Sequence, residues 1–222
     1  MALNTIGGKH HVEVAALILI SGTIVLIFFV ILSGVRDVPP FNRTWFLQVD
    51  SSGITGSKRS LTQWTYFFIC DAHNQNCGSP VPALPIGYGW QGGNQDVPSS
   101  LVGKYFYFLW RFGWVSYLMA LFFVSLGWLV AIVSVWTRLG SVISGVLITF
   151  AFFWHSIAAS LMTTAFVKAR DSFLHVGIVA KVGPYAFGFT WGAWVALLLS
   201  MIMLYLGLIN KTSDNYKKRR NQ

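Results

Sequence analysis

Residues 14–32 read VAALILISGTIVLIFFVIL and carry no charged side chain. As an α-helix rising about 1.5 Å per residue, this run spans about 28 Å, close to the thickness of the hydrocarbon core of a bilayer. The run is too long for the apolar core of a secretory signal peptide, and no small-residue cleavage pattern follows it. We therefore predict a membrane-spanning helix that remains in the protein.

Three further apolar stretches pass the same length test and divide the rest of the chain. The predicted segments are an N-terminal segment at 1–13, spans at 14–34, 105–136, 140–167 and 185–209, a long loop at 35–104, a tight turn at 137–139, a second loop at 168–184 and a basic tail at 210–222.

The composition of the 222 residues supports this class: 55% are hydrophobic, 16% aromatic and only 10% charged. A soluble domain carries about 25% charged residues, so a soluble globular protein is excluded, as are a disordered chain and a coiled coil. Two cysteines exclude a Cys-rich zinc module. We predict an all-α membrane protein, a four-transmembrane-helix bundle with a small disulfide-linked, β-containing extracellular loop domain.

The orientation follows from the basic residues, which divide almost evenly between the two sides until the long first loop is left out. Long loops cross the membrane largely regardless of charge, and the remaining basic residues favour both termini in the cytoplasm. The glycosylation sequon at Asn42 and the two cysteines, Cys70 and Cys77, all lie in the first loop and agree with this orientation.

The net charge of +9 is concentrated beside the spans and in the tail, which argues against nucleic acid as the partner. The tail contains Lys217, Lys218, Arg219 and Arg220. Such a cluster next to a span is attracted to anionic lipid by about 1 kcal/mol per residue. It also serves as an orientation signal, and the two interpretations are compatible.

The first loop contains enough aromatic and apolar residues for a small core. We predict one strand at Trp64–Ile69 and a weaker one at Phe46–Val49, because β-branched and aromatic residues dominate there. The stretch from Gly78 to Pro98 is expected to be irregular, with Tyr88 and Trp90 as anchors. We assign to the core of this loop Trp45, Trp64, Asp50 and Gly53.

Cys70 and Cys77 enclose a short polar segment, and outside the cell a disulfide is the natural interpretation. It would contribute about 2–3 kcal/mol in the chain-entropy model. A metal site with His73 has only three ligands, and a redox pair would favour C-x-x-C spacing.

The spans themselves contain no Asp or Glu, which argues against proton- or sodium-coupled transport. Arg111 either snorkels to the headgroups or pairs with Asp50. His155 is either a packing residue or part of a proton relay. Neither a nucleophile–base pair nor a metal cluster is recognisable, so we predict no catalytic residue, no metal and no enzyme.

Small residues at spacing four indicate close helix packing, either inside the bundle or against another subunit. They are Gly188 and Gly192 in the last span, and Ser141 and Gly145 in the third. Aromatic residues gather at 105–117, where they form an interfacial belt or hold sterol or sphingolipid.

Several segments carry a family pattern in order and spacing: Trp45–Ile54, close to W-L-Q-x-D-T-S-G-I, then Trp64–Cys70 with Asn76–Gly78, and later Arg138–Gly140, Leu161–Arg170 and Ala186–Trp191. In these the chain resembles, over about residues 15–208, the fungal Sur-seven/PalI family of four-span plasma-membrane proteins, which are eisosome-associated and distantly claudin-like.

The resemblance implies a non-enzymatic organiser or scaffold of eisosome-type plasma-membrane domains that supports cell-wall and stress physiology. An accessory subunit of a large polytopic complex, such as a cell-wall polymer synthase or proton pump, is the alternative, and a channel or transporter is a further one. The expected partners are the bilayer, anionic lipids, and a second copy or other polytopic membrane proteins. The only cofactor left open is bound lipid: sterol, sphingolipid or phosphoinositide.

Overall fold

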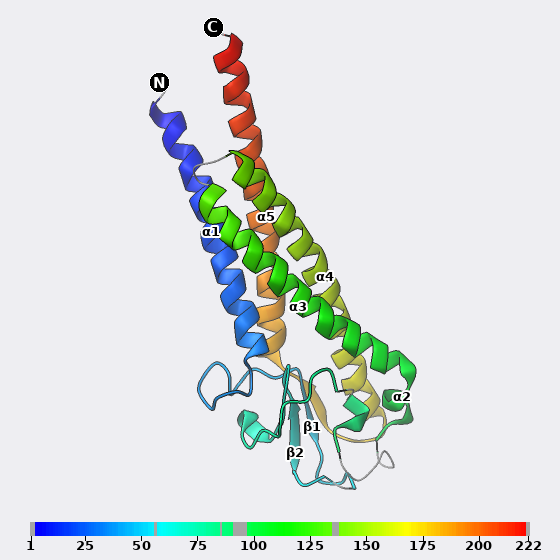
Figure 1. Cartoon of the computed structure of the whole chain (residues 1–222). Coiled ribbons are helices and arrows are strands. Elements are labelled where there is room, and N and C mark those ends of the chain that lie inside the picture. Colours follow the sequence, from blue (N-terminus) through cyan, green and yellow to red (C-terminus); the bar gives the residue numbers. More distant parts are fainter. Residues whose placement is uncertain (1–2, 56, 85, 91–96, 135–137, 221–222) are drawn as a thin grey trace. The chain divides into compact units, whose positions relative to one another are not determined.

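In the part of the chain that the structure describes, there are four long helices, and the loops between them share a small β-sheet (Figure 1). The structure, a computed structural model, describes residues 3–55, 57–84, 86–90, 97–134 and 138–220. For residues 3–11, 134, 138 and 210–220 it describes the backbone alone.

The long helices are α1 (Leu3–Ile31), α3 (Lys104–Ser134), α4 (Arg138–His175) and α5 (Pro184–Arg220). Each contains a segment long and apolar enough to cross a membrane: Val12–Ile31, Lys104–Val133, Leu139–His175 and Pro184–Ile209. The four helices expected from the sequence are therefore present.

The chain forms two compact units, which we describe separately. The helical unit combines the chain up to Val25 with Leu118–Ser156 and the chain from Gly192. The sheet unit combines Leu26–Tyr117 with Ile157–Trp191.

In the helical unit, the buried helix faces include small and polar residues, whereas many large apolar residues are exposed. On α5, Ala193, Leu197 and Ser200 are buried, whereas Val195 and Leu199 are exposed. Tryptophan–serine hydrogen bonds join helices here, with Trp128 Nε1 donating to Ser21 Oγ and Trp194 Nε1 to Ser156 Oγ, both at 2.8 Å. An apolar exterior over a small-residue interior is the pattern of helices that pack in lipid.

The sheet contains β1 (Leu47–Asp50), β2 (Leu61–Trp64), β3 (Ile69–Cys70) and β4 (Ala180–Val182), in the order β3-β2-β1-β4. All three pairings are antiparallel, and Leu47 lies opposite both Trp64 and Val182. Because β4 comes from the loop between α4 and α5, the sheet joins the two loops. A Cys70–Cys77 disulfide completes the predicted fold class, which is confirmed.

The single strand predicted at Trp64–Ile69 is wrong, because the chain reverses within it. Thr65 N donates to Phe68 O at 2.9 Å, and Phe68 N donates to Thr65 Oγ1 at 3.0 Å. A threonine hydroxyl offers the backbone such local bonds in place of a ladder. The result is a β2–β3 hairpin with Tyr66 at its tip.

Several boundaries also differ from the sequence-based segments. Helix α4 continues past 167 to His175, because Ala169 and Phe173 extend its buried face, and it ends in a Schellman motif at Gly177 (φ 80°). Residues 138 and 139, expected in a turn, begin α4, and the basic tail continues α5 as helix to Arg220.

Candidate functional site

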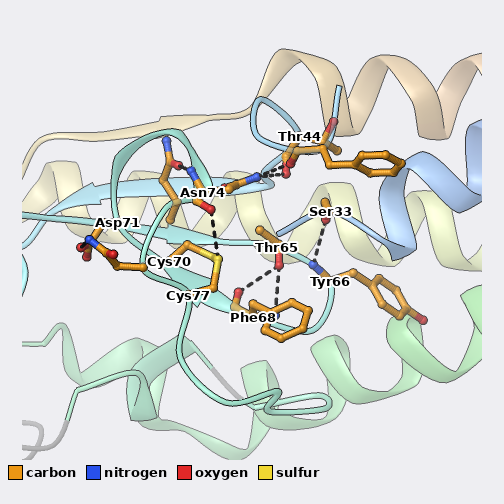
Figure 2. Close-up of a disulfide and its surroundings, with 12 residues drawn as sticks. Ser33, Thr44, Thr65, Tyr66, Phe68, Cys70, Asp71, Asn74 and Cys77 are labelled. Carbon is orange, nitrogen blue, oxygen red and sulfur yellow. Dashed lines mark hydrogen bonds between the residues drawn. A yellow bond between two sulfur atoms is a disulfide. The ribbon is translucent and has the colours of Figure 1, made fainter. Parts of the chain in front are cut away.

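The disulfide-closed loop of the sheet unit is held by a network of polar contacts. The Cys70–Cys77 bond joins residues whose Cα atoms lie 4.0 Å apart, which confirms the predicted disulfide (Figure 2). Within the loop, His73, Asn74 and Asn76 have positive φ angles of 58°, 51° and 45°. Asparagine tolerates this left-handed region better than most residues, so the Asn-rich sequence suits a tight reversal.

Asn74 fastens this loop to the chain that follows α1. Its side chain is 3% exposed, and Nδ2 donates to the carbonyl oxygens of Phe41 and Thr44, both at 2.7 Å (Figure 2). Its backbone N–H donates to Gln63 Oε1 at 2.9 Å, and Gln63 Nε2 donates to Gln48 Oε1 at 2.8 Å. One buried amide thus links the loop, two strands and the segment before β1.

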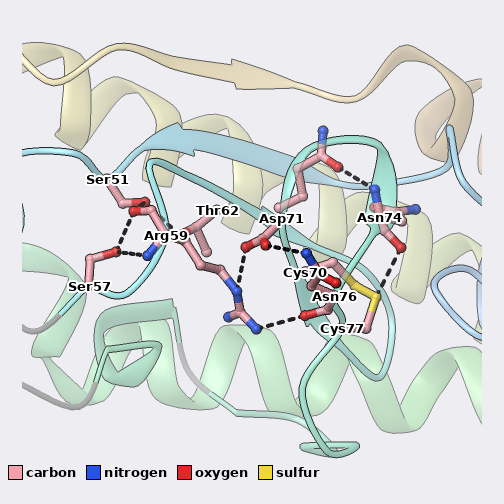
Figure 3. A network of polar contacts seen from close by, with 10 residues as sticks. Ser51, Ser57, Arg59, Thr62, Cys70, Asp71, Asn74, Asn76 and Cys77 are labelled. Atoms are coloured by element: carbon pink, nitrogen blue, oxygen red, sulfur yellow. Dashed lines mark hydrogen bonds and ion pairs between the residues drawn. A yellow bond between two sulfur atoms is a disulfide. The ribbon is translucent and has the colours of Figure 1, made fainter.

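Arg59 holds the other side of the loop. Its Nε lies 2.6 Å from Asp71 Oδ1, and its guanidinium donates to Asn76 O at 3.0 Å (Figure 3). Asn76 Nδ2 in turn donates to Asp71 Oδ2 at 3.1 Å. The ion pair is partly exposed and is worth no more than about 1 kcal/mol, so it orients the loop more than it stabilises it.

We expect Asn74→Ala to lower the free energy of unfolding by about 2–4 kcal/mol, because two carbonyl oxygens lose their buried donor. The matched control is Asn76→Ala, which changes an exposed asparagine of the same loop with a similar positive φ. Thermal unfolding of the purified protein in detergent measures both. Equal losses would mean that backbone strain, and not the Asn74 hydrogen bonds, sets the effect.

We expect Cys70→Ser and Cys77→Ser to destabilise the protein alike, by about 2–3 kcal/mol each, because either change opens the same covalent loop. The same unfolding measurement, repeated with a reductant, checks this. Reductant should lower the wild-type midpoint and leave both variants unchanged. A large effect of only one of the two serine substitutions would contradict the expectation.

Tyr66 anchors the hairpin tip to α3. Its hydroxyl donates to Trp114 O at 2.7 Å, Trp114 Nε1 donates to Tyr66 O at 3.3 Å, and the rings stack with centroids 5.4 Å apart. Its backbone nitrogen lies 3.5 Å from Ser33 Oγ, two residues beyond the end of α1. Burial, with a smaller contribution from Tyr117, raises the pKa of the Tyr66 phenol, so this hydroxyl stays a neutral donor.

The residues assigned to the loop core from sequence occupy different environments. Trp64 is buried and meets Trp90 edge-on at 5.1 Å, and Trp45 is partly buried. Asp50 and Gly53 are exposed, so the structure corrects their predicted assignment to the core. Asp50 instead accepts hydrogen bonds from Ser52 Oγ and N, which lower the pKa of its carboxyl group.

The ion pair considered between Arg111 and Asp50 does not form. Arg111 lies over the ring of Tyr107, 4.2 Å from its centroid, at the surface of α3. Of the two anchors expected after Gly78, Trp90 is buried and Tyr88 is 48% exposed. Asn42 Nδ2 donates to Asp37 Oδ1 at 3.0 Å, and glycosylation of Asn42 stays a prediction.

The small residues are placed on two kinds of surface. Ser141 and Gly145 are buried on α4. Gly188 is exposed on α5, and a Cβ there would meet nothing within 4 Å, while Gly192 is partly buried. The side chains of Lys217, Lys218, Arg219 and Arg220 lie outside the described residues, so lipid contact by the tail stays a prediction.

Sequence reasoning missed two buried polar residues. Asn74 looked like one of several polar loop residues, and only its neighbours along the fold distinguish it. Glu13 was placed outside the first span, yet it is 6% exposed on α1, and Ser141 Oγ donates to it at 3.5 Å. Its position directly before the apolar run was the signal available. His155 is fully buried on α4.

Open hollows lie on both sides of the disulfide loop. One holds about 490 Å³ beside Asp37, Phe68 and Gln75, and the other about 610 Å³ beside Arg59, Asp71 and Tyr88. Among the residues that the structure describes, no group of three His, Cys, Asp or Glu side chains could hold a metal ion.

Four apolar helices whose connecting loops form a disulfide-closed antiparallel sheet define a claudin-like, four-span membrane protein. Within this class, the chain belongs to the SUR7/PalI family, whose model matches residues 12–203. The family resemblance drawn from the sequence motifs is confirmed.

Curated fungal relatives agree with this assignment. The chain is 31% identical to Protein SUR7 of Candida albicans over 91% of this chain and 75% of the relative. It is 33% identical to SUR7 family protein FMP45 of Saccharomyces cerevisiae, over 87% of this chain and 65% of the relative. An uncharacterized plasma membrane protein of the same yeast is 27% identical, over 94% of this chain and 72% of the relative. The chain thus spans between 65% and 75% of these relatives.

Proposed function

We propose that this membrane protein is a non-enzymatic organiser of eisosome-type plasma-membrane domains that supports cell-wall and stress physiology. The observation that carries the proposal is the attachment of the sheet to its own helices. Tyr66 and Trp114 exchange two hydrogen bonds, and Asn74 joins the disulfide loop to the segment after α1. A surface held in a fixed orientation to the bilayer suits a protein that assembles neighbours.

The polar residues of the sheet unit support a structural role over a catalytic one. Arg59 and Asp71 form an ion pair, and the side-chain amide of Asn74 donates hydrogen bonds to two backbone carbonyls. An enzyme needs a nucleophile, base or metal ligand free to meet substrate in a recess. Asn74 lines one of the two hollows beside the loop, and Arg59 and Asp71 line the other, so the network reaches both.

The proposal places both termini in the cytoplasm of a multi-pass plasma-membrane protein. The N-terminal end of α1 and the C-terminal end of α5 lie on the same side of the helical unit, as an even number of spans requires (Figure 1). A disulfide persists on the oxidising side of the membrane, which puts the sheet outside the cell. The basic tail then faces the anionic cytoplasmic leaflet, where each cation contributes about 1 kcal/mol.

The partners we propose are anionic lipids and other copies of this chain. The exposed face of α5 is apolar, and Gly188 near one end of it carries no side chain that would keep a neighbouring helix away. Small residues let helix backbones approach closely in lipid.

The test is the mobility of the tagged protein in its native plasma membrane, followed by recovery after photobleaching. We expect stable patches with slow exchange, and patches lost in Tyr66→Leu molecules that still reach the surface. The control Tyr88→Leu changes an exposed tyrosine of the same loop and should keep the patches. A uniformly distributed, rapidly recovering wild type would overturn the proposal. Fixed-ratio co-purification with one large membrane enzyme or pump would identify an accessory subunit instead.

A further inference from the structure

An apolar groove runs between α3 and α4 in the sheet unit, separate from the disulfide loop. It holds about 400 Å³ and is lined by Lys104, Tyr105, Phe108, Leu109, Phe112 and Leu161. Phe108 is 64% exposed and Phe112 is 53% exposed, so the groove opens away from the protein. Since both helix segments belong to membrane spans, an opening of this kind faces lipid.

The groove is charged at one end only. Lys104 is the first residue of its span, and Lys168 Nζ donates to Tyr105 Oη at 3.1 Å and lies 4.9 Å from the centroid of that ring. The nearest acid along α4, Asp171, is held by Arg170 at 2.6 Å. Neither lysine forms an ion pair with any residue in the described part of the chain.

The depth of the groove matches a lipid that stands upright in the leaflet on the sheet side. Phe112 follows Tyr105 by seven residues on α3, and Leu161 precedes Lys168 by seven on α4, so each apolar end lies about 10 Å deeper than the charged end. Two ammonium groups at the boundary therefore stand above a channel lined by hydrocarbon and aromatic side chains.

We propose that this groove binds one membrane lipid with a net negative, phosphate-bearing headgroup, which contacts Lys104 and Lys168 while one acyl chain lies along Phe108, Phe112 and Leu161. Charge complementarity selects this occupant, because a zwitterionic headgroup brings its own cation to the lysines. The inference goes beyond the organiser role, since it requires only that the four helices span a bilayer.

Native mass spectrometry of the full-length protein, titrated with dioleoylphosphatidylglycerol or dioleoylphosphatidylcholine, tests the headgroup. Both titrations use a variant whose four basic tail residues, 217–220, are changed to Gln, so that tail binding does not contribute. We expect one phosphatidylglycerol bound at least fivefold more tightly than phosphatidylcholine. Lys104→Gln and Lys168→Gln should each weaken it roughly fivefold, since a surface cation contributes about that factor.

Arg111→Gln is the matched control, because it removes a cation about two turns further along α3. The guanidinium of Arg111 lies over Tyr107, and Arg111 does not line the groove. This substitution should leave the bound phosphatidylglycerol unchanged. Equal affinity for the two lipids, or an equal loss in Arg111→Gln, would overturn the proposal, as would a lipid-free dimer closed over this face.

A phosphatidylglycerol with a diazirine at the acyl chain midpoint locates the chain independently. Adducts are expected within 105–112 and 161–168, and adducts spread evenly over the lipid-facing helices would overturn the assignment. If the lipid experiments fail while the wild-type protein still forms immobile patches, the lipid site alone is refuted. If the lipid binds as expected while the wild-type protein forms no immobile patches, the organiser role alone is refuted.

Discussion

Gly183→Ala is expected to disrupt the sheet unit. Gly183 is buried directly after β4, and its N–H donates to Phe46 O at 3.0 Å. A Cβ at this position would overlap the carbonyl oxygen of Trp45 and press on its indole ring. Because a backbone oxygen cannot rotate away as a side chain can, β1 and β4 must separate, at a cost of at least about 3 kcal/mol.

The control for this prediction is Gly188→Ala, five residues further along the chain. A Cβ there meets nothing within 4 Å and lies in the helix α5, where alanine is favoured over glycine by up to about 1 kcal/mol. The two substitutions add the same methyl group and should have opposite signs. Thermal unfolding in detergent should show a drop of at least about 6 °C for the first and a small rise for the second. A wild-type midpoint for Gly183→Ala would show that β4 does not pair with β1 as described.

The helices could be predicted from sequence because their signal is local. An uninterrupted run such as Val14–Leu32 has one stable state in lipid, since only a helix satisfies its backbone polar groups there. The ends of the helices were harder to predict than their positions. The buried face of α4 continues beyond the hydrophobic run to Phe173, and the helix ends only before Gly177. Length and hydropathy do not reveal that the last turns of α4 are buried by the sheet unit.

The loops could be predicted only where covalent or compositional signals exist. The placement of Cys70 and Cys77 in a loop outside the cell indicated the disulfide, and aromatic density indicated a sheet. The position of β4 could not be foreseen, because Ala180–Val182 is short and pairs with a strand more than 130 residues earlier. Such a contact depends on which loops the helices bring together, and no local propensity encodes it.

In the aromatic segment Trp64–Ile69, local propensity predicted a strand that tertiary packing does not allow. Strand propensity is high throughout it, yet the side chain of Tyr66 forms buried contacts with Trp114 and Tyr117 on α3 that a continuous strand would not allow. Tertiary packing therefore decides the local conformation here. The turn bonds of Thr65 satisfy the backbone at the reversal.

Tyr66→Ala is accordingly expected to be the most destabilising side-chain truncation in the hairpin, at about 3–5 kcal/mol, because it leaves a cavity beside α3. The side chain is 1% exposed and contacts three aromatic rings, those of Phe67, Trp114 and Tyr117. Tyr66→Phe should cost only about 1 kcal/mol, since it keeps the packing and loses the hydroxyl bond to Trp114 O.

The series separates packing from hydrogen bonding when it is measured beside Tyr88→Ala and Tyr88→Phe, which alter a 48% exposed tyrosine of the same loop. Thermal unfolding in detergent should rank Tyr66→Ala far below Tyr66→Phe, with both Tyr88 variants near wild type. If Tyr66→Ala instead matched Tyr88→Ala, the hairpin would not be anchored to α3. The sheet would then be free to move against the spans, and an organiser that depends on a fixed surface would lose its physical basis.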